Sequence, residues 1–216
     1  MINVLLVDDH ELVRTGIKRI LSDARGIKVI GEAGTGEEAI RMVREQQPDV
    51  VLMDINMPGI GGLEATRKLK HMCPNLKVIV VTVYTDEPFP TRLMEAGAAG
   101  YLTKGSNVEE ILTAIRTVFE GERYIAADIA RQMAFSILPG GERSPLEKLS
   151  RREMQVMLMV TQGQSTQQIS DSLCLSPKTV STYRYRLYEK LGVDNDVELT
   201  HLAIRHGMMN ESHQPK

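Results

Sequence analysis

Apolar runs and amphipathic stretches alternate along the first 121 residues of the chain. Runs that are apolar on both faces predict parallel strands buried between helices. Five such runs, of which the second and the last are weaker, are Val4–Val7, Lys28–Ile30, Val50–Met53, Val78–Val81 and Gly100–Leu102. Apolar residues recur at helical spacing over 11–22, 36–46 and 108–119, and Gly or Pro marks most joints. Five strand–helix units in this length predict an open, doubly wound α/β sheet.

The remainder of the chain has a helical pattern without strands. We expect one helix over 125–138, followed by a linker over 139–145 that is rich in Pro and Gly. The pattern therefore predicts a first domain over 1–121, a linker with a helix over 122–148, a helical domain over 149–207 and a flexible tail over 208–216.

Capping signals divide the helical domain into four helices. Ser150–Glu153 and Ser165–Gln168 have the residue types of capping boxes, which open the first two helices. Ser176 and Pro177 provide an N-cap and a proline at the first position of a third helix, which ends near Gly192. A fourth helix is expected over 197–206. Two short helices joined by a tight turn, the second well capped and basic, are the signature of a helix-turn-helix.

The third of these helices has a polar face suited to a DNA groove. On a helical wheel its exposed side and flanks carry short polar groups, a tyrosine and cations: Lys178, Thr179, Ser181, Thr182, Arg184, Tyr185, Arg186 and Lys190. Short polar groups near the N-terminus suit base edges, and cations along the rims suit phosphates. An ordinary amphipathic helix with a solvated face would give the same wheel. The preceding capped helix and turn favour DNA.

Composition and charge limit the classes of protein to which this chain can belong. The chain has 216 residues with 26 Lys and Arg against 28 Asp and Glu, a formal net charge of −2. A local basic cluster within 176–190 therefore predicts a localised nucleic-acid contact, not a generally cationic binder. No apolar run is long enough to span a bilayer, and the start lacks the pattern of a secretory signal. Cys73 and Cys174 form no metal-ligand pattern, so we expect a cytoplasmic protein.

Polar side chains with complementary chemistry follow the predicted strands. Asp8 and Asp9 follow the first strand and Asp54 the third, while Thr82 and Lys104 end the fourth and fifth. The carboxyl ends of parallel strands form the ligand edge of an open sheet. Three carboxylates there would repel one another unless a cation such as Mg²⁺ lay among them. A lysine and a hydroxyl at the same edge could bind phosphoryl oxygens, which predicts phosphoryl transfer onto a carboxylate.

Each of these residues also has an ordinary explanation. Paired aspartates after a strand often cap the next helix, and a single Lys104 or Thr82 would be unremarkable as a surface lysine or a strand residue. The combination of all five at strand ends is what favours a site.

The motifs Val7-Asp8-Asp9-His10, Met53–Pro58, Val81-Thr82 and Tyr101–Lys104 resemble those of a two-component response-regulator receiver domain. The resemblance implies a five-stranded parallel sheet of order 2-1-3-4-5 with Asp54 as phosphoacceptor. It further implies Mg²⁺ as cofactor, bound by Asp9 directly, by Asp8 largely through water, by Asp54 and by the backbone carbonyl of Asn56. Thr82 and Lys104 would hold the phosphoryl oxygens, and Tyr101 would follow Thr82 as a switch residue. Such a receiver assists its own phosphotransfer and dephosphorylation but is not otherwise an enzyme.

Residues 149–206 resemble the LuxR-type helix-turn-helix, especially through Leu149–Glu153 and Leu175–Val180. The whole chain is similar to the GacA/UvrY/VarA group through Pro88–Arg92, Thr103–Gly105 and Thr182–Arg186. That resemblance implies a sensor histidine kinase as phosphodonor and activation of genes for small regulatory RNAs. We also expect a homodimer on an inverted repeat of double-stranded DNA, with RNA polymerase as a partner and no contact with the membrane.

Two other functions remain open at this point. A phosphatase of the dehalogenase type also uses an aspartate after its first strand, but it needs Asp-x-Asp where this chain has Asp8-Asp9-His10. A receiver that acts only through protein contacts would use its helical half as a docking module. Substrate turnover would identify the first, and DNA binding that persists when the third helix is changed would identify the second.

Overall fold

A computed structural model describes residues 1–83, 88–137 and 144–206. The chain divides into two compact units, one of residues 1–82 and 90–131 and the other of residues 83–89 and 132–216. Most of the linker expected over 139–145 and the tail expected over 208–216 lie outside the described residues.

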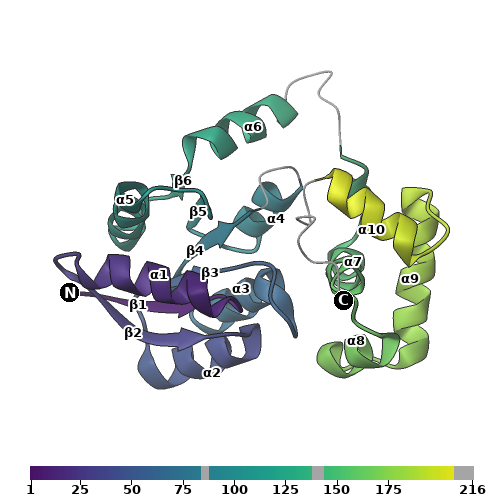
Figure 1. The fold of residues 1–216 in the computed structure, drawn as a ribbon, viewed down its shortest axis with the longest axis horizontal. Helices are drawn as coiled ribbons and strands as arrows, with labels where there is room; N and C mark the ends of the chain where they lie inside the picture. The colour runs from purple at the N-terminus through teal and green to yellow at the C-terminus, as the bar shows by residue number, and fades with distance from the viewer. Residues whose placement is uncertain (84–87, 138–143, 207–216) are drawn as a thin grey trace. The chain divides into compact units, whose positions relative to one another are not determined.

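The first unit is an open parallel sheet with helices on both faces (Figure 1). Its strands are β1 (Ile2–Val7), β2 (Ile27–Ala33), β3 (Val50–Met53), β4 (Lys77–Thr82), β5 (Gly100–Thr103) and β6 (Tyr124–Ile125). The helices are α1 (Glu11–Ser22), α2 (Gly36–Gln46), α3 (Gly61–Met72), α4 (Phe89–Glu95) and α5 (Val108–Phe119). A sixth helix, α6 (Ala127–Ile137), begins in the first unit and ends in the second. The strand order is β2-β1-β3-β4-β5-β6, which confirms the expected order of the first five strands.

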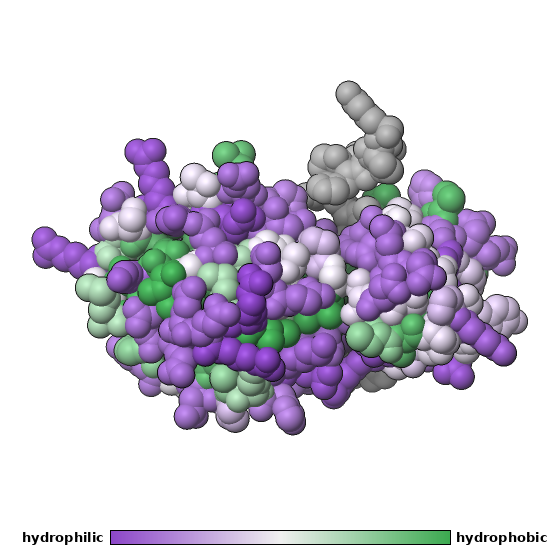
Figure 2. All heavy atoms as spheres, turned by 90° about the horizontal axis from the view of Figure 1, so that it is seen from below, coloured by the Kyte–Doolittle hydropathy of each residue, from purple (hydrophilic) through white to green (hydrophobic). Residues whose placement is uncertain are grey.

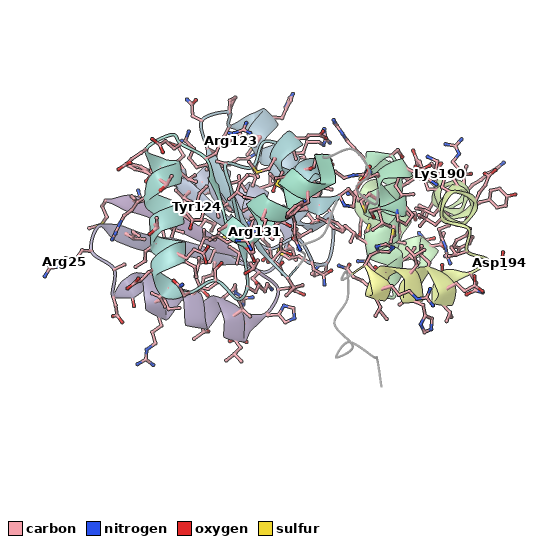
Figure 3. All side chains as sticks on the ribbon, turned by 90° about the horizontal axis from the view of Figure 1, so that it is seen from above. Arg25, Arg123, Tyr124, Arg131, Lys190 and Asp194 are labelled. Atoms are coloured by element: carbon pink, nitrogen blue, oxygen red, sulfur yellow. The ribbon has the colours of Figure 1, made fainter. Side chains whose placement is uncertain are left out.

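The sixth strand corrects the expectation of five strands followed by a helix from residue 125. Tyr124 and Ile125 pair in parallel with Gly100 and Tyr101 at the edge of β5 that would otherwise be free. The Tyr124 hydroxyl also donates a hydrogen bond to Glu110 on α5 (Figure 3). In the first turn of a helix, the backbone N–H groups have no partner within the helix. As a strand, Tyr124 and Ile125 instead form backbone hydrogen bonds with the edge of β5. The helix α6 therefore begins two residues later than expected.

Two apolar layers hold the sheet between its helices. On one face, Leu21 of α1 and Ile115 of α5 belong to a core with the inward residues of the central strands, such as Leu52. On the other face, Val43 of α2 and Leu69 of α3 pack on alternate residues of the same strands. The central strands are buried on both faces, which explains why their sequences are mostly apolar.

The second unit is helical. It contains a short 3₁₀ helix η1 (Pro145–Lys148) and four α-helices: α7 (Arg151–Thr161), α8 (Thr166–Leu173), α9 (Pro177–Leu191) and α10 (Asp196–Arg205). Both expected capping boxes are present, at Ser150 and at Ser165. Ser176 caps α9 by accepting the backbone N–H of Thr179. The expected four-helix arrangement is therefore confirmed, with η1 as an additional turn before it.

An ion pair between the exposed Lys190 and the buried Glu153 connects α9 to the start of α7. The Lys190 ammonium donates to Glu153 at 2.7 Å and to the Lys148 carbonyl at 3.3 Å (Figure 3 labels Lys190). Burial alone would raise the pKa of Glu153, but hydrogen bonds from Lys190 and Ser150 outweigh it and lower that pKa. Lys190 was expected to flank the DNA-facing side of its helix. It instead lies over the start of α7, because a buried carboxylate on that helix requires a charged partner.

The turn of the helix-turn-helix contains a strained residue. Cys174 ends α8 in the left-handed conformation, with φ 52°. A side chain at such a position costs about 1–2 kcal/mol that glycine avoids, while glycine adds freedom to the unfolded chain. We expect Cys174→Gly to raise the free energy of unfolding by about 1 kcal/mol in denaturant titrations. Cys174→Ala, which keeps a Cβ, should bring no such gain; equal gains from both variants would contradict the argument from strain.

Hydrophilic residues cover most of the face drawn in Figure 2, and its apolar residues gather in small patches. Among the described residues, no helix combines the length and the hydropathy required to cross a membrane.

Candidate phosphoacceptor site and recognition helix

The ends of β1 and β3 bring the expected carboxylates together. The backbone N–H of Asp54 donates to the Val7 carbonyl at 2.8 Å, so the two strand ends lie side by side. As a result, Asp8, Asp9, His10 and Asp54 have potential ligand atoms that all lie within 4.8 Å of one another. The strand-end pattern alone predicted the three aspartates; the proximity of His10 was not expected.

Lys104 lies between two of these carboxylates. Its ammonium nitrogen is 2.7 Å from Asp8 Oδ2 and 2.9 Å from Asp54 Oδ2. Its backbone N–H donates to the Thr82 carbonyl at 2.9 Å, which fixes the end of β5 beside the end of β4. Sheet pairing therefore brings the lysine to a carboxylate that is fifty positions away in the sequence.

The backbone around Asp54 holds its carboxylate in place. Asp54 Oδ1 accepts N–H groups from Ile55 at 2.7 Å and from Asn56 at 3.3 Å. The first turn of α3 packs directly against the backbone of Asp54. A Cβ added to Gly62 would lie 1.9 Å from the Asp54 carbonyl oxygen. Only a glycine allows the helix to abut the chain at this point. The N–H of Asn56 reaches the Asp54 carboxylate, so Asn56 lies at the rim of the site. The role of its carbonyl as a metal ligand stays a prediction.

The negative charges of Asp8, Asp9 and Asp54 exceed the single positive charge of Lys104, so the site has room for a further cation. Burial raises the pKa of the Asp54 carboxyl, and Asp8 adds to the rise although Lys104 opposes it. Burial alone would lower the pKa of Lys104, but Asp54 and Asp8 outweigh it and raise that pKa. Three carboxylates share one ammonium, and their oxygens are close enough to coordinate one ion. Hard oxygen donors of this kind fit Mg²⁺, so the donor set agrees with the cofactor that the motifs imply.

Thr82 and Tyr101 are both fully buried. Tyr101 pairs with Val80, two residues before Thr82 on the neighbouring strand. Because side chains alternate along a strand, Thr82 and Tyr101 project from the same face of the sheet as diagonal neighbours. This placement suits a tyrosine whose position responds to the threonine, and the switch role of the pair stays a prediction.

Sequence reasoning missed two residues that contact the acidic loop. His10 Nδ1 lies 2.9 Å from Asp9 Oδ1 and 3.2 Å from Asp8 Oδ1. Arg14, one turn into α1, donates to the Asp8 backbone carbonyl at 2.6 Å. The position of His10 directly after paired aspartates was a usable signal. For Arg14 there was none, because its contact depends on where α1 starts relative to the loop.

The recognition helix α9 exposes most of the expected face. Lys178, Ser181, Thr182, Tyr185 and Arg186 are exposed, and the Tyr185 side chain is 71% exposed. On the opposite side, Val180, Leu187 and Leu191 are buried. Thr179 is half-buried, and its hydroxyl pairs with that of Ser176 at 2.8 Å in the N-cap. The exposed set therefore lies along the first two and a half turns.

Arg184, which was expected to contact phosphates at the rim, has partners on three helices of the domain. Its guanidinium donates to the hydroxyls of Thr166 at 2.8 Å and Tyr188 at 3.3 Å, and it forms an ion pair with Asp196. It thereby joins the starts of α8 and α10 to the middle of α9. The wheel placed Arg184 at the border of the polar face, and a carboxylate from another helix drew it inward.

Comparison with known proteins assigns the class. Residues 4–116 match the model of the response regulator receiver domain, and residues 147–203 match that of the bacterial regulatory proteins of the luxR family. The chain belongs to the two-component response regulators that join a receiver domain to a LuxR-type DNA-binding domain. This membership favours a response regulator over the dehalogenase-type phosphatase.

Two curated relatives are similar over nearly the whole chain. Response regulator UvrY of Escherichia coli K12 is 60% identical over 211 residues, which cover 97% of both chains. Response regulator GacA of Pseudomonas aeruginosa is 59% identical over 97% of this chain and 99% of its own. The expected resemblance to this group is thus confirmed. A structure of the Salmonella typhimurium RcsB response regulator shares the fold, with TM-score 0.78 and 23% identity over 95% of this chain and 98% of that one.

Proposed function

We propose that phosphorylation of Asp54 controls DNA binding by α9, which makes the chain a phosphorylation-dependent regulator of transcription. The observation that carries the proposal is the buried Asp54 carboxylate, held 2.9 Å from the Lys104 ammonium beside two further aspartates. The exposed polar start of α9 supplies the output.

Each residue of the site has a separate role in phosphoryl transfer. An Asp54 oxygen attacks the phosphorus of a phosphohistidine on a sensor kinase, the P–N bond breaks, and an acyl phosphate forms. Asp8, Asp9, Asp54 and the Asn56 carbonyl would hold Mg²⁺, which supplies positive charge for the phosphoryl oxygens. Lys104, already beside Asp54, exchanges its carboxylate contact for a phosphoryl oxygen, with Thr82 as a second donor. Tyr101 then follows Thr82 and transmits the change.

DNA recognition is assigned to the exposed start of α9. Lys178 and Arg186 contact phosphates, while Ser181, Thr182 and Tyr185 face base edges in the major groove. Exposed Val197 on α10 supports a homodimer contact, and two copies would read an inverted repeat.

The finer assignments follow from resemblance to the GacA and UvrY regulators. They are activation of transcription together with RNA polymerase, and targets that include small regulatory RNA genes. The proposed extents are a receiver over 1–121, a linker with a helix over 122–148, a DNA-binding domain over 149–207 and a tail over 208–216.

Sequencing of genomic DNA retained by the full chain tests the proposal. The protein is used with and without treatment by a small phosphodonor and Mg²⁺. We expect phosphorylation to enrich a small set of fragments that share an inverted repeat. Retention of no specific fragment in either state would reject DNA control and leave the helical unit as a protein-docking module.

Lys104 should matter for the response more than for phosphate uptake. Lys104→Ala removes the cation that would move from the carboxylates to the phosphoryl group, so the acyl phosphate should form without reorganising the site. We expect this variant to take up phosphate and yet bind DNA near its unphosphorylated level, as measured by fluorescence anisotropy. Lys68→Ala on the exposed side of α3 is the control. Wild-type switching without Lys104 would remove that residue from the mechanism.

A further inference from the structure

The imidazole of His10 lies among the carboxylates at the separations that ligands of one ion have. Its Nδ1 is 2.9 Å from Asp9 Oδ1 and 3.2 Å from Asp8 Oδ1. In an octahedral site with metal–ligand distances of about 2.1 Å, neighbouring donors lie about 3.0 Å apart. One of the two ring nitrogens of His10 is also within 4.8 Å of a carboxylate oxygen of Asp54. A cation bound by Asp9 and Asp54 would therefore have the His10 nitrogen within reach.

The loop between β1 and α1 fixes this placement. The His10 N–H donates to Asp8 Oδ1 at 2.8 Å, and the His10 carbonyl accepts the N–H of Arg14 as the first bond of α1. The backbone at His10 is thus held on both sides. The side chain is 41% exposed, whereas the Asp8 and Asp54 side chains are 7% and 2% exposed. The imidazole therefore stands at the solvent side of the cluster, where Mg²⁺ would keep water.

We propose that His10 is a nitrogen ligand of the cation held by Asp9 and Asp54, and that it makes this site prefer Mn²⁺ over Mg²⁺. Mg²⁺ prefers oxygen donors and gives up its water reluctantly, whereas first-row transition ions accept imidazole readily. The carboxylates would bind either ion, and the nitrogen adds more affinity for Mn²⁺ than for Mg²⁺. The inference rests on the proposed function in one respect, namely that this cluster is the cation site.

Cation titrations of the full chain at about pH 8, above the range in which free imidazole titrates, test the proposal. Electron paramagnetic resonance follows the signal of free Mn²⁺, and Mg²⁺ affinity is obtained by competition. We expect His10→Asn to lower the affinity for Mn²⁺ about tenfold and to change that for Mg²⁺ less than about twofold. The matched control is His71→Asn, which replaces an exposed histidine at the end of α3 and should change neither affinity.

Pulsed electron paramagnetic resonance of bound Mn²⁺ gives a second measurement that needs no variant. A directly bound imidazole nitrogen should couple to the ion in the wild type and in His71→Asn, and this coupling should be absent in His10→Asn. Equal loss of Mn²⁺ and Mg²⁺ affinity in His10→Asn, or no nitrogen coupling in the wild type, would overturn the proposal. Neither result affects Mg²⁺-dependent phosphorylation of Asp54, whose failure in the wild type would instead reject the proposed function.

Discussion

Asp54→Asn should abolish uptake of acid-labile phosphate from a small phosphodonor, with a loss of more than about a hundredfold against the wild type. An amide oxygen cannot form the acyl phosphate, and Asp54 is the most deeply buried of the three aspartates in the cluster. The Asp54 carboxylate accepts the N–H groups of Ile55 and Asn56 and lies 2.9 Å from the Lys104 ammonium. Phosphate incorporation into the full chain in the presence of Mg²⁺ tests whether Asp54 is the acceptor.

The same variant should be at least as stable as the wild type. Because the pKa of Asp54 is raised in the folded protein, the folded state binds a proton more tightly than the unfolded chain does. The ionised carboxylate therefore destabilises the fold at neutral pH, and this effect disappears as the pH falls through the raised pKa. We expect the free energy of unfolding of Asp54→Asn at pH 7 to equal or exceed that of the wild type in denaturant titrations. Loss of phosphorylation would then not be a loss of fold.

Asp23→Asn provides the matched control, since Asp23 is an exposed aspartate at the end of α1. It should take up phosphate like the wild type. Undiminished, acid-labile phosphate on Asp54→Asn would show that a different carboxylate is the acceptor and that the site has been assigned wrongly.

Lys178→Ala and Thr182→Ala should weaken DNA binding in two different ways. Lys178 is exposed in the first turn of α9, where a cation contacts phosphate whatever the base sequence. Its removal should weaken all duplexes similarly and lower the salt slope by about one unit. Thr182 is exposed one turn further along, where a short hydroxyl and its methyl group meet base edges. Its removal should cost about 1–3 kcal/mol at the preferred site and little on random DNA.

Binding of both variants to specific and random duplexes over a series of salt concentrations separates the two roles. Thr182 donates its hydroxyl to the Lys178 carbonyl at 3.0 Å, so Thr182→Ser, which keeps that bond, serves as the conservative control. Equal weakening of both duplexes by Thr182→Ala would show that it does not read bases. Unchanged affinity for the specific duplex in both variants would place the DNA-binding surface elsewhere.

Local patterns in the sequence determined most of the fold. The strand β3 is fully apolar and β1 is apolar except for Asn3, because helices cover both faces of the sheet, so each could be recognised without knowledge of its partners. Ser150, Ser165 and Ser176 cap helices through bonds to residues three positions away, and such contacts are visible in sequence spacing. The strand ends also identified Asp54 and Lys104, because parallel topology places the ends of all strands along one edge.

Only the tertiary structure decided which long side chains pair with a carboxylate on another helix and which loops meet. Arg184 and Lys190 look like rim cations on a helical wheel, but each is drawn to a carboxylate on another helix, Asp196 and Glu153. Tyr124 begins a sixth strand because the edge of β5 is open. His10 comes near Asp54 because the ends of β1 and β3 lie side by side. Each of these contacts joins residues from different helices, strands or loops, and chain packing decides which of them meet. Hydrophobic periodicity and capping residues indicate only contacts within one helix or strand.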